Sequence, residues 1–440
     1  FSTNKNEDAS FLQTFLFEDT ADQKKAWKEI CEDLSASIPM DRLLCGDVGF
    51  GKTEIAMRAA FKAAYSGKQV AVLAPTTILA SQHFSNFEKR MSEFAITVGL
   101  ISSFRKKCDV NELVSRLKSG DLDIIIGTHA LFSDDIIFKK LGLLIIDEEQ
   151  KFGVAQKEKL KQVRKEVDVL ALTATPIPRT LILAIYGDMD ISKLIEKPSY
   201  RKEIVTLSKP ESKIDEVLIF LNKQIMNGNK VFWVCPLIEE SKNFDYTAAV
   251  KQHTYLNKFF SNKVGLIHGS IDQNKKELIL KKFLDGVYDI LVSTTIIEVG
   301  IDFPKANVIV IENSNKFGLS QLHQLRGRVG RGEKQGTCIL LYKKNLSENA
   351  KKRIRILKST NDGFKIAEED MKIRGFGDIL GFQQSGLKDF KLADPIHHEK
   401  LFKMAEENIK EIENSNQDFK KYNNLLKLYD KAEIINDIEV

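Results

Sequence analysis

The segment GDVGFGKT, which ends at Thr53, matches the pattern GxxxxGK[ST] and stands between an apolar run and a helix-forming stretch. Its glycines, Gly46, Gly49 and Gly51, let backbone N–H groups approach an anion without an obstructing Cβ, and a helix N-terminus adds positive partial charge. Lys52 is suited to reach the β- and γ-phosphates, and the hydroxyl of Thr53 is suited to a Mg²⁺ ion. The segment therefore predicts a binding site for ATP and Mg²⁺.

Two carboxylates follow another apolar run, LLIIDEEQ, about 95 residues after Lys52. Acidic residues that end a strand are usually part of an ordinary loop, but ligands of open α/β sheets bind at this end of the strands. Asp147 is suited to coordinate Mg²⁺, and Glu148 is suited to orient and deprotonate an attacking water. Together with the phosphate-binding loop, the pair predicts hydrolysis of the bound nucleotide.

Arginine is rare in this chain, with 14 residues among the 66 lysines and arginines. Three of them, Arg326, Arg328 and Arg331, fall within the segment QLRGRVGR. The planar guanidinium grips a transferring phosphoryl group with two hydrogen bonds, which lysine cannot do. A basic helix end at the surface would also explain the cluster. With a phosphate-binding loop in another domain, we expect Arg328 and Arg331 to act in catalysis when the domains close.

These residues need a scaffold that brings strand ends together, and the first half of the chain alternates apolar runs with helical stretches. Strands buried on both faces and separated by helices are typical of a parallel sheet. The predicted strands are Leu43–Leu44, Val70–Leu73, Val98–Ile101, Ile124–Ile126, Leu143–Ile146 and Val169–Leu172. The predicted helices are Thr20–Leu34, Lys52–Ser66, Ile78–Met91, Val110–Lys118, Gln156–Val163 and Arg179–Tyr186, after an irregular start over the first twenty residues.

The alternation breaks near Glu196–Ser199 and then restarts. The second set of predicted strands is Ile204–Leu207, Val231–Val234, Val264–Ile267, Ile290–Val292, Val308–Ile311 and Cys338–Leu341. The predicted helices among them are Lys213–Met226, Thr247–Phe260 and Asn274–Leu284. From Ser347 onward the pattern is helical and strongly charged. We therefore expect an α/β fold with two parallel-sheet domains, residues 1–197 and 198–346, followed by a helical region over residues 347–440.

Composition excludes several classes of protein. Of the 440 residues, 43% are hydrophobic and 29% are charged, which is typical of a folded globular protein. No apolar run approaches the roughly 18 residues of a membrane span, so no membrane partner is expected. The five cysteines are scattered without a CxxC pair, so we expect no structural metal and a reducing cytosol. A net charge of +5 permits nucleic-acid binding without arguing for it.

Shorter segments between these sites are weak signals when each is taken alone. TATP is most simply a turn, and a single histidine such as His268 in IHGS is more often structural than functional. The loop STTIIEVGID carries small donors that suit a nucleic-acid phosphate or a nucleotide ribose. In chain order, however, these segments resemble the motif series of superfamily 2 helicases over nearly the whole chain. The series consists of PTTILASQ, GTHAL, DEEQ, TATP, IHGS, STTIIEVGID and QLRGRVGR, with Gln23 upstream.

Within that superfamily, three segments resemble two bacterial families that translocate on double-stranded DNA. They are KFGV after DEEQ, IPRT after TATP, and FGLSQLHQLRGRVGR. The two families are the branch-migration helicase RecG and the transcription-repair coupling factor Mfd. Both carry a helical hairpin called TRG, which the residues Asp362–Phe364, Ile373–Gly377 and Gln384–Gly386 match. DEEQKFGV in the first half resembles Mfd, whereas VCPLIEES and FKLAD in the second half resemble RecG. The second half and the end of the chain favour RecG.

The resemblance implies two RecA-like motor domains with the TRG hairpin after them. It implies further nucleotide contacts from Gln23, Gly300 and Asp302, with Thr53 and Asp147 at the metal. It implies DNA-binding or coupling roles for Thr76, Thr128, Thr175, His268, Thr294, Arg374 and Gln384. The expected activity is ATP-driven translocation on double-stranded and branched DNA, for branch migration and fork remodelling, in the bacterial cytoplasm at the nucleoid.

Two alternatives remain open at this point. The chain could be the motor of a coupling factor that displaces RNA polymerase, or a catalytically idle fragment that only binds DNA. Because it starts at Phe1 rather than Met, we expect it to be a fragment that lacks the wedge domain of RecG. The split between its halves would fit a hybrid or misassembled gene.

Overall fold

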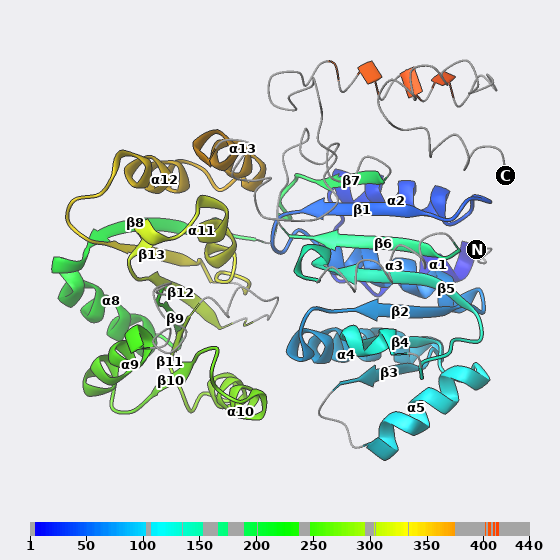
Figure 1. The fold of residues 1–440 in the computed structure, drawn as a ribbon, viewed down its shortest axis with the longest axis horizontal. Helices are drawn as coiled ribbons and strands as arrows, with labels where there is room; N and C mark the ends of the chain where they lie inside the picture. Colours follow the sequence, from blue (N-terminus) through cyan, green and yellow to red (C-terminus); the bar gives the residue numbers. More distant parts are fainter. Residues whose placement is uncertain are drawn as a thin grey trace, which may run out of the picture. The chain divides into compact units, whose positions relative to one another are not determined.

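A computed structural model describes residues 5–102, 107–133, 135–152, 166–174, 189–199, 201–236, 247–294, 303, 305–332 and 334–374, and also 401, 404–405, 408–409 and 411–412 (Figure 1). Phe1–Pro178 and Asp188–Ser385 form one compact unit. The second unit, Arg179–Gly187 and Gly386–Val440, lies almost wholly outside the described residues. Within the described part, none of the helices combines the length and apolar character that crossing a membrane requires.

The first half of the described chain folds around a seven-stranded parallel sheet in the order β3-β4-β2-β5-β6-β1-β7. Its strands are β1 (Asp41–Gly46), β2 (Gln69–Leu73), β3 (Val98–Ile101), β4 (Ile124–Gly127), β5 (Leu141–Asp147), β6 (Asp168–Thr173) and β7 (Asp190–Leu194). All strands predicted for this half are confirmed. The edge strand β7 was not among the predictions, because its sequence DISKL alternates polar and apolar residues instead of forming an apolar run.

The register of this sheet determines where the chemistry is placed. Strand β6 pairs with β5 on one side and with β1 on the other, so Asp147 lies opposite Leu172 and Cys45 lies opposite Thr173. Because all strands are parallel, the carboxyl ends of β1, β5 and β6 reach the same edge of the sheet. That edge therefore receives the phosphate-binding loop after β1 and the two carboxylates at the end of β5.

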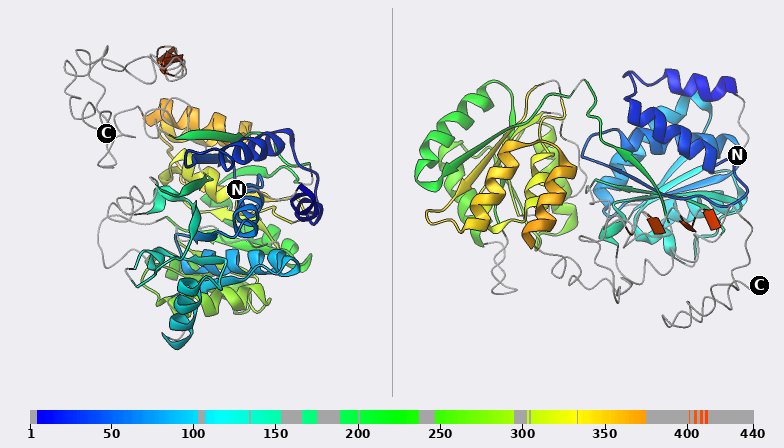
Figure 2. Two further views of the ribbon diagram at one scale, coloured as in Figure 1. Left: turned by 90° about the vertical axis from the view of Figure 1, so that its right-hand side faces the viewer. Right: turned by 90° about the horizontal axis from the view of Figure 1, so that it is seen from above.

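Helices cover both faces of this sheet (Figures 1 and 2). They are α1 (Lys5–Gln13), α2 (Ala21–Asp33), α3 (Lys52–Tyr65), α4 (Thr77–Met91) and α5 (Lys107–Ser119). The expectation of an irregular N-terminus is wrong, because α1 occupies part of it. Phe11 of α1 is buried, and its ring stacks on Phe61 of α3 with the centroids 4.2 Å apart. The helices predicted at Gln156–Val163 and Arg179–Tyr186 lie outside the described residues.

The second half contains a six-stranded parallel sheet in the order β10-β11-β9-β12-β13-β8. The strands are β8 (Val205–Pro210), β9 (Lys230–Val234), β10 (Val264–Ile267), β11 (Ile290–Ser293), β12 (Ala306–Ile311) and β13 (Thr337–Tyr342). The helices are α8 (Ile214–Met226), α9 (Thr247–Phe259), α10 (Gln273–Leu284) and α11 (Leu319–Arg326). The predicted α/β class with two parallel sheets is confirmed.

Two further helices, α12 (Glu348–Ser359) and α13 (Gly363–Arg374), lie side by side against the second sheet (Figure 2). Leu357 and Ile366 are buried in the same hydrophobic core as strands β9 and β12. Asp370 of α13 accepts hydrogen bonds from the N–H and hydroxyl of Ser320, at the start of α11. The first part of the region 347–440 thus packs with the second sheet, and a domain boundary at residue 347 stays a prediction.

A buried ionic network ties the N-terminal segment to the helix that follows the phosphate-binding loop. Glu54 is 5% exposed and accepts hydrogen bonds from Arg58 at 2.9 Å and from Arg90 at 2.9 and 3.0 Å. Arg58 also makes two bonds with Asp19, and Arg90 donates to the hydroxyl of Thr14. Two of the rare arginines are therefore used to hold the chain before α2 against α3.

We expect Glu54→Ala to lower the free energy of unfolding by about 3 kcal/mol, because it removes the buried carboxylate that Arg58 and the partly buried Arg90 share, while Asp19 still pairs with Arg58. Glu32→Ala is the matched control, since the partner of Glu32, Lys28, is 79% exposed and such surface pairs contribute at most about 1 kcal/mol. Denaturant unfolding of both variants beside the unmodified chain measures the difference. Equal losses in the two variants would contradict the structural role of the network.

Candidate nucleotide site

The phosphate-binding loop starts where β1 ends at Gly46 and runs into α3 at Lys52. Gly49 and Gly51 have φ angles of +80° and +85°, a left-handed backbone that residues with a Cβ rarely adopt. Gly51 is the N-cap of α3 and gives that end no side-chain cap, so backbone N–H groups face outward as an anion site. The guanidinium of Arg201 lies against the loop, since a Cβ on Gly49 would stand 2.2 Å from its Nη1.

Lys52 is buried at the centre of this loop. Its ammonium group donates to the backbone carbonyls of Gly46 at 2.6 Å and Asp47 at 2.9 Å. Burial lowers the pKa of Lys52 below its ordinary value, and the carboxylates of Glu148, Asp47 and Asp147 oppose that shift. The ammonium group of Lys52 is therefore surrounded by carboxylates, and a bound phosphate would add further negative charge around it.

Gln23 braces the loop from the side of α2. Its side chain completes a capping box with Thr20, the N-cap residue of α2, in which each side chain bonds the other residue's backbone N–H. The amide nitrogen of Gln23 then donates to the carbonyl of Phe50 at 2.9 Å. The predicted nucleotide residue Gln23 is thus in direct contact with the loop that carries Gly49 and Gly51.

The two predicted carboxylates lie at the end of β5. Asp147 is its last residue, and one of its carboxylate oxygens lies 2.8 Å from Nε2 of His83, a buried histidine of α4. Glu148 follows in a left-handed conformation with φ of 53°, and its N–H donates to the carbonyl of Leu172 on β6. The chain therefore bends directly after β5, at the second of the two carboxylates.

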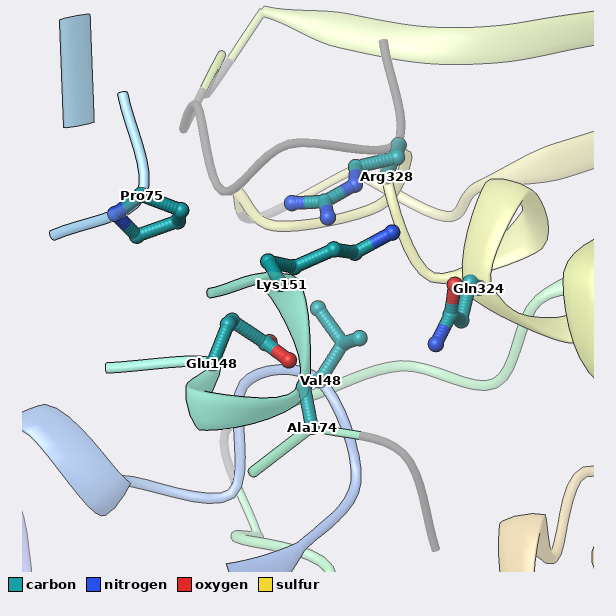
Figure 3. A pocket seen from close by; sticks show the side chains of 7 residues that line it. All are labelled: Val48, Pro75, Glu148, Lys151, Ala174, Gln324 and Arg328. Carbon is teal, nitrogen blue, oxygen red and sulfur yellow. The ribbon is translucent and has the colours of Figure 1, made fainter. Parts of the chain in front are cut away.

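A pocket joins these residues to the arginine-rich segment (Figure 3). Figure 3 shows Glu148 and Lys151 projecting into it from the first sheet, while Gln324 and Arg328 enter from the segment around α11. Val48, Pro75 and Ala174 complete its lining. Arg328 is only 5% exposed, whereas Arg331 is half-buried and its Nε donates to the carbonyl of Gly327 at 3.3 Å. The structure thus brings Arg328 and Glu148 to one pocket.

The phosphate-binding loop and α11 also meet through side chains. Nε2 of His323 lies 2.8 Å from a carboxylate oxygen of Asp47, and Nδ1 of the same ring lies 2.8 Å from a guanidinium nitrogen of Arg326. The other carboxylate oxygen of Asp47 accepts the N–H of Val48 at 2.7 Å. Burial would raise the pKa of Asp47, but His323, the N–H of Val48 and the charge of Lys52 together hold it below its ordinary value.

Four of the residues assigned to DNA binding or coupling follow the carboxyl ends of strands. Thr128 comes directly after β4, His268 after β10 and Thr294 after β11, and Thr76 is the N-cap of α4, just beyond β2. Burial lowers the pKa of His268, with a smaller contribution from the charge of Lys276. The remaining predicted site residues lie outside the described residues, namely Thr175, Gly300, Asp302, Gln384 and the side chain of Arg374.

Sequence reasoning missed the partners of the predicted residues, namely His83, Lys151, Arg201 and His323. A usable signal existed for the two histidines. The chain has only 7 histidines, and His83 directly follows PTTILASQ while His323 directly precedes QLRGRVGR. Arg201 follows the break at Glu196–Ser199 and carried no comparable signal, because nothing local relates it to a loop about 150 residues earlier.

Three family descriptions match successive parts of the chain. Residues 20–183 match the DEAD/DEAH box helicase family, and residues 211–333 match the helicase conserved C-terminal domain. Residues 360–434 match the C-terminal part of domain 3 of the ATP-dependent DNA helicase RecG. These matches agree with the two parallel sheets, which form a helicase fold with two RecA-like domains.

Individual relatives of the chain include both RecG helicases and transcription-repair coupling factors. The chain is 45% identical over 405 residues to the ATP-dependent DNA helicase RecG of Thermotoga maritima, covering 92% of this chain and 52% of that protein. It is 44% identical over 396 residues to the transcription-repair-coupling factor of Bacillus subtilis, covering 88% and 33% respectively. A structure of RecG bound to a three-way DNA junction superposes with a TM-score of 0.76 at 43% identity, covering 91% of this chain and 52% of that one.

The chain is thus similar over most of its length to both the RecG helicases and the transcription-repair coupling factors. It spans about half the length of the curated RecG relatives it matches. More distant structures, such as yeast Dbp5 bound to RNA at 16% identity and a TM-score of 0.59, share the fold alone.

Proposed function

We propose that this chain is an ATP-hydrolysing motor that moves along double-stranded DNA, and that the whole protein serves branch migration and fork remodelling in recombination and repair. The observation that carries the proposal is the pocket lined by both Glu148 and Arg328. A carboxylate can activate water there, and a guanidinium can stabilise the transferring phosphoryl group. Each comes from a different RecA-like domain, so hydrolysis would depend on how the domains meet.

ATP and Mg²⁺ fit the residues at the carboxyl edge of the first sheet. The backbone of Gly46, Gly49 and Gly51 would hold the phosphates with Lys52, while Gln23, Gly300 and Asp302 would make the remaining nucleotide contacts. The hydroxyl of Thr53 and a carboxylate oxygen of Asp147 are the hard oxygen ligands that Mg²⁺ prefers. The ion would neutralise charge that develops on the phosphates, while Glu148 holds the proton of the attacking water.

DNA is the proposed track, which a RecG relative solved with a three-way junction supports. Thr76, Thr128, Thr175, His268 and Thr294 would contact it, because they follow strand ends or stand in loops with small hydrogen-bond donors. Arg374 and Gln384 of the TRG segment would couple hydrolysis to movement. We place this activity on double-stranded and branched DNA in the bacterial cytoplasm, at the nucleoid.

A second candidate is the motor of a coupling factor that displaces RNA polymerase. The specific observation in its favour is the near-equal identity of the chain to both families, 45% to one RecG and 44% to one coupling factor. The match of residues 360–434 to a RecG domain favours the first candidate.

The proposal is tested by assaying the purified chain for ATP hydrolysis without DNA, with linear duplex and with a three-way junction. Displacement of a third strand from a triplex then measures translocation on the same preparation. We expect Mg²⁺-dependent hydrolysis that rises with duplex and junction DNA, together with strand displacement. DNA binding without hydrolysis would instead identify an idle fragment. Release of a stalled RNA polymerase without junction unwinding would favour the coupling-factor motor.

A further inference from the structure

A continuous buried chain of hydrogen bonds runs from the phosphate-binding loop to the end of α12. His323 bridges Asp47 and Arg326 with both contacts at 2.8 Å. Arg326 continues to the backbone carbonyls of Leu357 at 2.7 Å and Thr360 at 2.9 Å. The side chains concerned are well buried, with Asp47 6%, His323 4% and Arg326 2% exposed.

The chemistry of these groups fixes the direction of the hydrogen bonds. A guanidinium has donors but no acceptor, so Nδ1 of His323 must accept from Arg326. The ring proton therefore lies on Nε2, which donates to the carboxylate of Asp47. A second proton on Nδ1 would face the N–H of Arg326, so this contact requires Nδ1 to remain an acceptor. Arg326 thus selects the tautomer of His323 that can bind Asp47.

Asp47 transmits this contact to the cation of the site. Its side chain is held by His323 and by the N–H of Val48, and its backbone carbonyl accepts the ammonium of Lys52 at 2.9 Å. The position of α11 is therefore connected through one residue to the group that neutralises phosphate charge. Buried hydrogen bonds of this kind are strong in a low dielectric and costly to leave half-satisfied.

We propose that His323 is a positioning residue for ATP hydrolysis, with Arg326 as its orienting partner and Asp47 as its target on the phosphate-binding loop. The inference rests on the proposed hydrolysis and adds a contact distinct from Arg328 and Arg331. Those two arginines would face the phosphates, whereas His323 holds the loop itself against α11. Replacing His323 should therefore lower turnover more than nucleotide affinity, because Gly49, Gly51 and Gln23 still hold the nucleotide when the hydrogen bonds from Arg326 through His323 to Asp47 are broken. We call this set of hydrogen bonds the relay.

The test uses His323→Leu, His323→Gln, Asp47→Asn and the double variant Asp47→Asn with His323→Leu, all in the full chain. We expect His323→Leu to lower kcat by about tenfold or more, within the range of contacting pairs, with less than a threefold change in the affinity for a fluorescent ADP. Glutamine offers both a donor and an acceptor, so His323→Gln should recover most of the rate. The two carboxylate oxygens of Asp47 accept from Nε2–H of His323 and from the N–H of Val48. An asparagine has only one such oxygen, so Asp47→Asn should lose one of the two hydrogen bonds and should also lower kcat.

The relay predicts that the double variant loses no more activity than the worse single variant, since both changes break one contact. His253→Leu is the matched control, because His253 bonds the carbonyl of Val264 and the amide of Asn257, both in its own domain. Its kcat should stay unchanged. Thermal unfolding of each variant separates lost packing from lost positioning.

Several outcomes would overturn the proposal. Wild-type kcat in His323→Leu, additive losses in the double variant, or equal losses in His323→Gln and His323→Leu would each refute it. If His323→Leu does not fold, Asp47→Asn and His323→Gln decide by the same comparison. Absence of hydrolysis in the unmodified chain would refute the proposed function and this inference together, whereas hydrolysis that survives in the variants refutes the inference alone.

Discussion

Lys52→Ala is expected to lower kcat for ATP hydrolysis by at least about 10²-fold, and Glu148→Gln by about 10²- to 10⁴-fold. Lys52 is the buried cation among the carboxylates of Asp47, Asp147 and Glu148. Its removal leaves those charges to repel both one another and the phosphates of ATP. Glu148→Gln keeps the shape of the side chain but removes the group that would accept a proton from water.

The two substitutions are expected to differ in their effect on ATP binding. Glu148→Gln should still bind ATP, which a fluorescent nucleotide measures, whereas Lys52→Ala should bind it more weakly. Lys62→Ala is the matched control, since Lys62 lies on the same helix and pairs with Asp8 at 3.2 Å, away from the loop. Its turnover should remain near that of the unmodified chain. Ordinary turnover in purified Lys52→Ala or Glu148→Gln would remove the claim of hydrolysis at this site.

The parts of the site that could be predicted are those written in consecutive residues. GDVGFGKT and LLIIDEEQ each carry their chemistry within eight positions, and the strand before each is apolar because the sheet buries both of its faces. The spacing of such strands also sufficed to predict two parallel sheets. Parallel pairing then places Gly46 and Asp147 at one edge of the first sheet without further information.

The missed elements depend on contacts that local pattern does not contain. Strand β7 alternates polar and apolar residues, and it is defined by pairing with β1 at the sheet edge. Helix α1 has a mostly polar sequence, and its place is set by Phe11 stacking on Phe61 and by Arg90 reaching the carbonyl of Phe11. Neither partner is near in sequence, so neither element had a signal of its own.

The same limit applies to the contacts between the domains. His323 and Asp47 are 276 positions apart, and no spacing rule relates residues at that separation. Only the folded chain shows that α11 brings a histidine to the loop and Arg328 to the pocket beside Glu148. Residue type suggested that the arginines bind phosphate, but the structure was needed to show that Arg328 lines the same pocket as Glu148.

Arg328 and Arg331 are expected to act through the geometry of their guanidinium groups as well as through charge. An arginine that stabilises the transferring phosphoryl group contributes about 10³- to 10⁵-fold to turnover in related phosphoryl-transfer enzymes. Lysine keeps the charge but loses the planar fork. We therefore expect Arg328→Lys and Arg331→Lys each to lower kcat by about tenfold or more, with the larger loss at Arg328, which lines the pocket with Glu148.

Steady-state ATP hydrolysis with saturating duplex DNA measures this effect, and DNA affinity is measured on the same samples. Arg353→Lys is the matched control, because its guanidinium donates to the carbonyls of Phe317 and Asn315, just before α11, and does not line the pocket. A basic patch that only attracts DNA predicts the opposite result, namely unchanged kcat and weaker DNA binding in the variants of Arg328 and Arg331. A guanidinium that bonds the phosphoryl group affects turnover, whereas a positive charge that only attracts DNA affects DNA affinity. Measuring kcat and DNA affinity on the same variant therefore distinguishes the two roles.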